Sequence, residues 1–463
     1  MFTANVYKER REALRRQLDG GLILLLGNSE ASSNYPDNTY HFRQDSSFLY
    51  FFGITNPGFA GVIDVEGGEE TIFGNDFTMD DIIWMGPQPS VSYQASEVGV
   101  ANSAPLSNLK PLIEKALRQG RKVHFLPPYR HANKLWLEEL TGIRIAQLST
   151  NVSVELIKAI VNLRSVKSEL EIAEIERACD IGYEMHTTAM RMCRPGVKEQ
   201  LIAGSIEGIA LSHGAGVSFP TILSMNGETL HNHYHGNILT EGRLMLTDAG
   251  AETNMNYCSD FTRTMPVGGR FTQRQKDIYN IVVAAHDCAI DHARPNNTWK
   301  EVHLEVCRTL TRGLKELGLM QGDVDEAVAA GAHALFMPHG LGHMMGLDVH
   351  DMEDLGQIYV GYDDEIRPST QFGLASLRMG RRLQEGFVIT DEPGIYFIPA
   401  LIDQWRAEGM HTNFLCYDAI EKYKDFGGVR LEDDVLITAK GSRFLGQKRI
   451  PLYVDEVEEI MNK

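Results

Sequence analysis

The segment PHGLGHMMGLDVHD (residues 338–351), called here the histidine-rich segment, brings His339, His343 and His350 together within a short stretch. Gly340 and Gly342 disfavour a regular helix, so the four-residue spacing of the first two histidines does not indicate a helix face. The segment predicts either a metal site or a glycine-rich loop that happens to contain histidines. The rest of the sequence has to decide between them.

The size and charge of the chain narrow the classes of function. A length of 463 residues exceeds the size at which single cores stop growing, so we expect two domains. The net charge of -18 argues against nucleic acid and against an anionic membrane as the main partner, because both attract basic surfaces. The N-terminal segment lacks a signal-peptide core, and no apolar run is long enough to span a membrane. We therefore expect a cytoplasmic protein.

The cysteines do not form a recognisable framework. No two of them have CxxC spacing, and no cysteine has an obvious histidine partner in the sequence. We expect all six to be reduced, as in a cytoplasmic protein. They are Cys179, Cys193, Cys258, Cys288, Cys307 and Cys416.

The first part of the chain alternates predicted helices with predicted strands, which indicates an α/β domain over residues 1–160. The expected helices cover residues 5–18 and 107–119, and the expected strands lie within residues 21–27, 61–65, 69–74 and 122–128.

The second part, residues 165–463, mixes long helices with strand-like runs and indicates an α+β domain. Three capping boxes predict helix starts, because Ser or Thr is followed three residues later by Glu or Gln. They are Ser168 with Glu171, Thr272 with Gln275, and Thr298 with Glu301. Strand-like runs occupy residues 243–252, 257–267, 387–397 and 428–438.

Each of these strand-like runs carries an acidic residue among apolar neighbours. Asp248 and Asp260 lie at equal distances from Asn254, so a hairpin centred there would place the two carboxylates opposite each other, roughly 5 Å apart. Two ionised carboxylates at this distance need a cation, a shared proton or an exposed position. Glu392 and Glu432 occupy the other two runs.

Four buried carboxylates favour a centre with two divalent ions, because a single buried charge without a partner costs several kcal/mol. Taken singly, each of these residues is more typical of a turn or a solvated surface. Oxygen ligands with one imidazole fit Mn²⁺, with Co²⁺, Fe²⁺ or Zn²⁺ as alternatives. The sequence contains none of the motifs that would indicate another enzyme class. HExxH, GxSxG, GxxxxGK[ST] and a strand-borne GxGxxG are all missing.

The acidic and histidine-rich motifs resemble those of the pita-bread metallopeptidases. The matching segments are TDAG, SDFTRT, HGLGHMMGLDVHD, TDEPGIY and GVRLEDD, in that order, and FRQDSSFLYFFG (residues 42–53) resembles the N-terminal domain of aminopeptidase P and prolidase. The resemblance covers nearly the whole chain. It implies an α/β N-terminal domain over 1–160 and an α+β pita-bread catalytic domain over 165–463.

The resemblance also implies roles for nine residues. The ligands of two metal ions would be Asp248, Asp260, His343, Glu392 and Glu432, with Asp260 and Glu432 bridging the ions. Glu392 would accept a proton from the water that the ions activate. The remaining residues would bind substrate, stabilise developing charge or support a bridging carboxylate: His231, His339, His350 and Arg430.

The function implied is that of an Xaa-Pro aminopeptidase with two Mn²⁺ ions, acting on peptides with proline at the second position. The family is commonly dimeric or tetrameric, so we expect a homo-oligomer. An Xaa-Pro dipeptidase shares all five ligands and is the nearest alternative. Creatinase-like enzymes lack the full metal set, and a metal-free module that binds peptides or histones is disfavoured because every ligand position is filled.

Three features depart from the pattern of the family. The spacing between the two aspartates is one residue longer than usual, and the turn near residues 254–256 must absorb it. Segments 355–380 and 398–426 are longer than in a minimal member and are expected to cover the active site or to form subunit contacts. His233 and His235 leave open which imidazole near His231 reaches the substrate.

Overall fold

The computed structural model describes all 463 residues and divides into two compact units. The first unit comprises Met1–Arg164 and Glu353–Tyr359, and the second comprises Ser165–Met352 and Val360–Lys463. None of the helices combines the length and the hydropathy that a membrane crossing needs. None of the six cysteines forms a disulfide bond.

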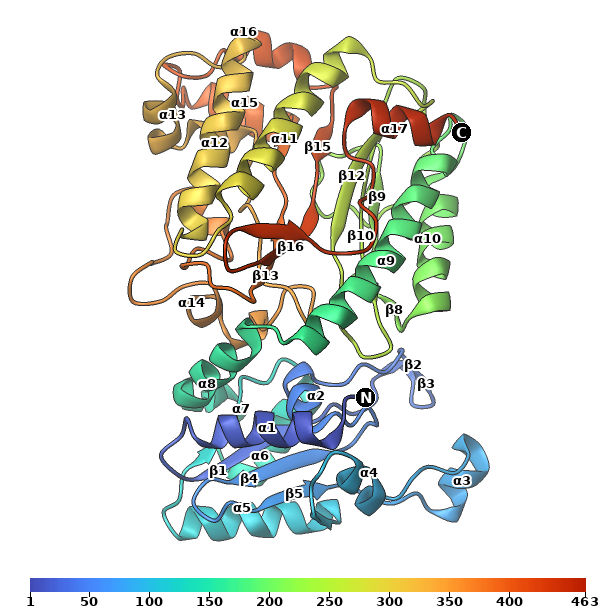
Figure 1. The fold of residues 1–463 in the computed structure, drawn as a ribbon, viewed down its shortest axis with the longest axis vertical. Coiled ribbons are helices and arrows are strands. Elements are labelled where there is room, and N and C mark those ends of the chain that lie inside the picture. The colour runs from blue at the N-terminus through green and yellow to red at the C-terminus, as the bar shows by residue number, and fades with distance from the viewer. The chain divides into compact units, whose positions relative to one another are not determined.

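The first unit is built on a five-stranded mixed sheet with the order β6-β5-β4-β1-β7 (Figure 1). Strand β1 is antiparallel to β4 and parallel to β7. The elements are α1 (Ala4–Arg15), β1 (Leu22–Leu26), β2 (Ser32–Tyr35), β3 (Asn38–Thr39), α2 (Ser46–Phe52), β4 (Ala60–Asp64), β5 (Glu70–Phe73), α3 (Met79–Met85), α4 (Val91–Glu97), β6 (Asn102–Ala104), α5 (Leu109–Arg118), β7 (Val123–His124), α6 (His131–Thr141), α7 (Ile145–Asn151) and α8 (Val154–Ser165).

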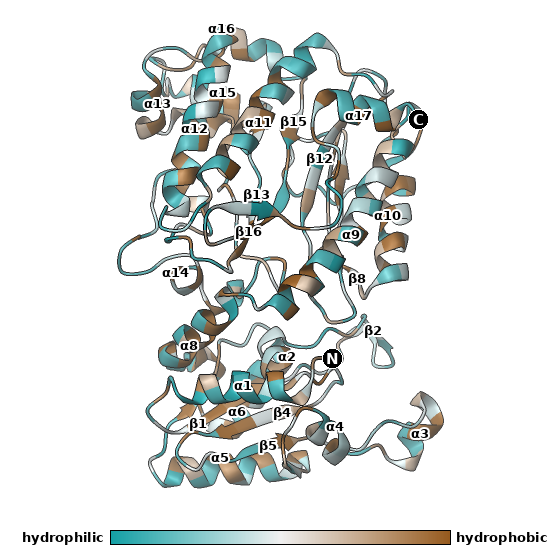
Figure 2. Cartoon of the chain, in the orientation of Figure 1, coloured by the Kyte–Doolittle hydropathy of each residue, from teal (hydrophilic) through white to brown (hydrophobic).

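The two faces of this sheet are covered by different helices. Leu22 and Leu24 alternate along β1 and join a buried cluster with residues of α5 and α6. On β4, Gly61 leaves room for the ring of Phe52 from α2, since a Cβ there would lie within 2.1 Å of that ring. Figure 2 shows the apolar residues of this unit concentrated on its central strands. None of the nine predicted site residues belongs to this unit.

The second unit contains two antiparallel three-stranded sheets, β12-β10-β9 and β13-β16-β17, with shorter strand pairs beside them. Its elements are α9 (Glu169–Met192), α10 (Glu199–His213), β8 (Gly216–Val217), β9 (Ile222–Ser224), β10 (Leu244–Ala249), β11 (Ala251–Glu252), β12 (Phe261–Pro266), α11 (Gln273–His292), α12 (Trp299–Glu316), α13 (Val324–Ala330), η2 (Ala332–Leu335), β13 (Val388–Asp391), β14 (Gly394–Tyr396), α15 (Pro399–Ala407), α16 (Tyr417–Ile420), β15 (Gly428–Arg430), β16 (Asp433–Ile437), β17 (Ser442–Phe444) and α17 (Val454–Met461).

Two pairs of long helices flank these strands, α9 with α10 and α11 with α12 (Figure 1). Helices α9, α11 and α12 all begin at the predicted capping boxes, in which each side chain accepts a hydrogen bond from the backbone of its partner. The three predicted helix starts are therefore confirmed.

The two sheets are joined where the acidic residues lie. A single β-bridge links Thr262 of β12 to Glu432, which directly precedes β16. A second bridge links Met344 of the histidine-rich segment to Ile389 of β13. These two bridges bring strand ends from distant parts of the sequence to one place.

The predicted pairing of Asp248 with Asp260 is wrong. Asp248 pairs with Thr262, so the hairpin is centred on Met255 and not on Asn254. Residues two apart on a strand point to the same face, so Asp260 still lies on the face that carries Asp248. The two carboxylates are diagonal neighbours instead of direct partners.

A three-residue loop explains the shifted register. The backbone N–H of Thr253 donates to the carbonyl of Tyr257, and the N–H of Asn256 donates to the carbonyl of Thr253. Asn256 has a positive φ of 65°, a left-handed conformation that asparagine tolerates better than most residues. An odd-numbered loop with a left-handed third residue absorbs the additional residue that the sequence shows between the aspartates.

The histidine-rich segment runs along the edge of β13 and is not a free loop. Thr390 donates its N–H to the carbonyl of His343, and Glu392 donates its N–H to the carbonyl of Leu341. Between these contacts a Cβ on Gly342 would lie 1.9 Å from the carbonyl oxygen of Thr390. Glycine at this position therefore allows the backbone to approach β13 closely enough to place His343 beside Glu392.

We expect Gly342→Ala to lower the free energy of unfolding by about 2 kcal/mol or more, because the backbone has to move away from β13. Gly208→Ala is the matched control: Gly208 is exposed on α10 with nothing within 4 Å of an added Cβ, so alanine should be neutral or slightly stabilising there. Urea unfolding of both variants measures the difference. Equal stability of the two would contradict the close approach.

Candidate metal centre

One cavity of about 580 Å³ in the second unit is lined by all nine residues predicted for the site. Its other wall residues include apolar side chains, a serine and a second arginine. The nine are His231, Asp248, Asp260, His339, His343, His350, Glu392, Arg430 and Glu432.

The four carboxylates sit at strand ends. Asp248 belongs to β10 and Asp260 directly precedes β12, while Glu392 directly follows β13 and Glu432 directly precedes β16. Because strand ends are fixed by the ladders behind them, the backbone positions of all four are set by the two sheets. Asp260, Asp248 and Glu432 are buried, and the side chain of Glu392 keeps an exposure of 19%.

His343 is oriented as a ligand. Its Nδ1 lies 3.0 Å from the carbonyl oxygen of Met344, so Nδ1–H donates to that carbonyl and Nε2 is left as the acceptor. Nε2 points at the carboxylates, 3.4 Å from Oδ2 of Asp260 and 3.9 Å from Oε1 of Glu392. A second ring hydrogen bond of this kind is typical of histidines that bind metals.

Arg430 holds one side of the centre in place. Its guanidinium donates to Oδ2 of Asp248 at 2.5 Å, to the hydroxyl of Tyr396 at 2.8 Å and to the hydroxyl of Thr262 at 3.1 Å. Thr262 in turn donates to Oε2 of Glu432 at 2.6 Å. Tyr396 and Thr262 were not among the predicted site residues, although they lie within the motifs TDEPGIY and SDFTRT.

His339 is fixed by protein partners at both ring nitrogens. Nδ1 lies 2.8 Å from the carbonyl oxygen of Gly340, and Nε2 lies 2.9 Å from the hydroxyl of Tyr396. Its Nδ1 is also 3.8 Å from Oε2 of Glu392. Burial, and then the charge of Arg430, lower the pKa of His339 to about 3, so the ring is neutral.

The other histidines differ in their surroundings. The ring of His350 packs edge-on against that of His343, with 4.2 Å between centroids. His231 and His233 both line the cavity. Burial and the charge of Arg430 lower the pKa of His231, whereas Nδ1 of His233 is within 3.5 Å of the carbonyl of Thr221.

The electrostatics of the centre fit divalent metal ions. Burial, and then repulsion by neighbouring carboxylates, raise the pKa values of Asp260 and Glu432 well above their usual range. Oδ1 of Asp248 and Oδ1 of Asp260 are buried and have no hydrogen-bond partner. Buried oxygens without partners are costly unless a cation binds them. The donor set of four carboxylates and one imidazole suits two such ions.

A layer of residues behind the ligands supports their backbone. Oδ2 of Asp434 accepts the N–H of Asp260 at 3.0 Å. Nε2 of His286 lies 3.0 Å from Oδ2 of Asp433 and 3.7 Å from Oδ2 of Asp391. Burial alone would lower the pKa of His286, but Asp391, Asp287 and Asp433 together raise it to about 9, so the ring carries a charge that links the paired strands β13 and β16.

Arg263 completes this layer, because its guanidinium donates to Oδ1 of Asp433 at 2.7 Å and to the carbonyl of Glu432 at 2.7 Å. The supporting residues come from helices and strands far apart in the sequence, so only the fold brings them to the ligands.

One of the two long segments reaches the cavity. Segment 355–380 supplies Ser376 and Arg378 to the wall. Segment 398–426 instead forms α15 and α16 and contributes no residue to the lining. The first segment therefore borders the active-site cavity, and for the second the alternative of a subunit contact stays a prediction.

Comparisons with known families match both parts of the chain. The model described as Metallopeptidase family M24 matches residues 173–439. The model described as Aminopeptidase P, N-terminal domain, matches residues 7–142.

Comparisons with individual proteins agree with these families. The chain is 32% identical over 459 residues to the Xaa-Pro dipeptidase of Homo sapiens, covering 96% of this chain and 89% of that protein. It is 31% identical over 466 residues to the Xaa-Pro aminopeptidase of Escherichia coli (strain K12), covering 98% of this chain and 97% of that protein. A zinc-substituted E. coli aminopeptidase P in complex with product superposes with a TM-score of 0.81 at 29% identity, covering 100% and 98%.

Glu392→Gln should have opposite effects on stability without and with metal. Burial raises the pKa of Glu392 from 4.5 to about 7, so its contribution to stability is present below about pH 4.5 and lost as the pH rises through about 7. In EDTA above pH 7, the variant should therefore be more stable than the wild type, by on the order of 3 kcal/mol.

With Mn²⁺ in excess the order should reverse, because the variant has lost a ligand. Urea unfolding across this pH range, with EDTA or Mn²⁺, measures both effects. A variant that is less stable than the wild type under both conditions would contradict the account of carboxylate repulsion.

Proposed function

Because the chain belongs to metallopeptidase family M24 and carries an aminopeptidase P N-terminal domain, we propose that it is an Xaa-Pro aminopeptidase, a metallo-exopeptidase that removes an N-terminal residue preceding proline. The observation that carries the proposal is the convergence of nine residues from separate motifs on one cavity. Relatives along nearly the full length of the chain bear the same activity.

The predicted fold class is confirmed. An aminopeptidase P-type α/β N-terminal domain is followed by an α+β pita-bread catalytic domain, as in the aminopeptidase P structures that cover the whole chain. For the limits of the two domains we propose residues 1–160 and 165–463.

We propose that Asp248, Asp260, His343, Glu392 and Glu432 hold two metal ions, with Asp260 and Glu432 between them. Two bound divalent ions supply Lewis-acid polarisation of a carbonyl and a water of lowered pKa. The unpaired oxygens of both aspartates and the outward-facing Nε2 of His343 support this assignment. Mn²⁺ is the proposed ion, because hard carboxylate oxygens dominate the donor set.

Glu392 is placed to handle the proton. One of its oxygens faces His343 and the other faces His339, so it can contribute one oxygen to the centre and hold a proton on the other. The partial exposure of Glu392 leaves a route for that proton into the cavity.

The remaining residues are proposed to orient the substrate and to stabilise the charge that develops on it. His350 and His231 face the cavity and are proposed to hydrogen-bond the substrate and the oxyanion that forms. Arg430 keeps Asp248 in position and, through the hydroxyl of Tyr396, also fixes the ring of His339. His339 is thus proposed to contact the substrate with its ring held in one orientation.

The cavity suits proline. Phe219, Pro220 and Leu230 form an apolar part of its wall, against which a prolyl ring can pack. The Xaa-Pro bond is a tertiary amide without an N–H, so a site that recognises it cannot rely on that donor. Peptides with proline at the second position are the proposed substrates.

A second candidate function, Xaa-Pro dipeptidase, is favoured by one observation. Arg378 brings a guanidinium to the wall of the cavity. A guanidinium binds a carboxylate strongly, and the carboxylate of a dipeptide follows directly after its proline. The human Xaa-Pro dipeptidase is as similar to the chain as the aminopeptidase relatives are.

The location of the protein and its assembly are proposed as well. None of the six cysteines forms a disulfide bond, which supports a cytoplasmic location. For the expected dimer or tetramer, helix α3 offers a surface, because Met79, Ile83, Trp84 and Met85 are all more than half exposed on it.

Protein loaded with Mn²⁺ should release the N-terminal residue from an Xaa-Pro-Xaa peptide. The test follows amino-acid release from that peptide and from an Xaa-Pro dipeptide in parallel. Cleavage of the dipeptide alone would overturn the aminopeptidase in favour of the dipeptidase. His350→Ala is the control for the site: it should keep its metal ions and lose turnover, because His350 is not among the proposed ligands.

Arg378→Met should weaken use of the dipeptide if its guanidinium binds the terminal carboxylate. Loss of one charged hydrogen bond costs roughly 1.5–3 kcal/mol, which raises KM about tenfold or more. A dipeptide with an amidated C-terminus should be unaffected by the change. Arg382→Met is the matched control, since Arg382 lies four residues after Arg378 and pairs with Glu365 at the surface. An equal loss for both dipeptides would exclude the carboxylate contact.

A further inference from the structure

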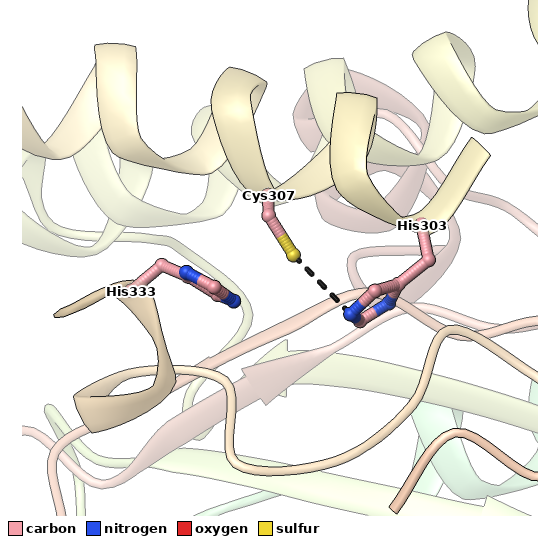
Figure 3. Close-up of side chains that lie close together, drawn as sticks. All are labelled: His303, Cys307 and His333. Atoms are coloured by element: carbon pink, nitrogen blue, oxygen red, sulfur yellow. Dashed lines mark hydrogen bonds between the residues drawn. The ribbon is translucent and has the colours of Figure 1, made fainter. Parts of the chain in front are cut away.

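A second group of metal-binding side chains lies outside the cavity. His303 and Cys307 are four residues apart on α12, which places them on one face of that helix, and His333 belongs to the short helix η2. Figure 3 shows the three side chains pointing toward a common space. Their ligand atoms all lie within 4.8 Å of one another, and all three residues are buried. The structure thus corrects the expectation that no cysteine has a histidine partner.

The distances within this group fit a bound ion. Sγ of Cys307 lies 3.5 Å from Nε2 of His303. A sulfur and a nitrogen that bind the same metal ion at about 2.3 and 2.0–2.1 Å are about 3.5–3.8 Å apart, for a tetrahedral or a trigonal arrangement. A thiol–imidazole hydrogen bond gives a similar distance, so the pair alone does not decide between the two.

The third residue points to a ligand. His303 turns Nε2 toward the thiol, and Figure 3 shows the ring of His333 pointing at the same space from η2. The contact between Cys307 and His303 is the one hydrogen bond within the group, so no such bond holds the ring of His333 to the other two side chains. A coordinated ion would join all three.

The charge of the surroundings selects the ion. The groups that act on His303 are the neutral imidazoles of His333 and His339, and no carboxylate is among them. Cys307 can supply one negative charge, so a monovalent ion would leave the group neutral, whereas a divalent ion would leave an uncompensated buried charge. One thiolate with two imidazoles is also a soft donor set, unlike the carboxylate-rich centre.

We propose that His303, Cys307 and His333 bind one Cu⁺ ion. The S–H bond of Cys307 breaks on binding, the sulfur coordinates the ion, and the proton leaves to solvent. The ion ties η2 to α12, and η2 lies directly ahead of the histidine-rich segment. It therefore stabilises the base from which His339 and His343 project. This site is independent of the proposed peptidase activity.

The test uses the full chain with its Mn²⁺ already bound, titrated with Cu⁺ under anaerobic, reducing conditions against a chromophoric Cu⁺ chelator. The wild type should withhold one equivalent from the chelator, and Cys307→Ser should lose it. Cys288→Ser is the matched control, because Cys288 also pairs with a histidine four residues away, His292, but has no third ligand beside it. This control should keep the equivalent.

Retention of Cu⁺ by Cys307→Ser at the level of the wild type would overturn the proposal, and so would failure of the wild type to withhold any. His333→Ala is a second variant, from the other helix, and should lose the equivalent as well. Mn²⁺-dependent peptide hydrolysis and the far-UV circular dichroism spectrum verify that each variant is folded. Cu⁺ should raise the melting temperature of the wild type and of Cys288→Ser, and leave that of the other two unchanged.

Discussion

The repulsion between four carboxylates around one cavity is the constraint on which the catalytic unit depends. Asp248, Asp260, Glu392 and Glu432 converge there, and Arg430 is the cation hydrogen-bonded among them. Burial and mutual repulsion raise the pKa values of Asp260 and Glu432, and divalent cations bound there would relieve that repulsion. Without bound cations, holding these four carboxylates together would only destabilise the fold.

The scaffold counters that repulsion by fixing the backbone of the proposed ligands from behind. The bridge between Thr262 and Glu432 joins the two sheets at the ligands themselves, and Asp434 receives the backbone N–H of Asp260. A charged His286 links the strands that end at Glu392 and Glu432. A preorganised centre of this kind needs little rearrangement when ions and substrate bind.

Sequence patterns predicted the parts of this architecture that depend on local chemistry. Capping boxes fix helix starts through contacts within one turn, and acidic residues among apolar strand residues mark strand ends that need a partner. The hairpin register was predicted wrongly, because the loop around Met255 has an odd number of residues and a left-handed Asn256. The contacts of Tyr396 with Arg430 and His339 join segments far apart in the chain, so no local pattern could reveal them. The four-residue spacing of His303 and Cys307, by contrast, is a local pattern that the sequence itself displays.

The central claim is that five ligands hold two divalent ions in one cavity. Anomalous diffraction from a crystal grown with Mn²⁺, with data recorded on both sides of the manganese absorption edge, tests it most directly. The account predicts two neighbouring manganese peaks in the cavity, with Asp260 and Glu432 contacting both and His343 contacting only one. A single peak, or peaks that do not touch these carboxylates, would contradict it.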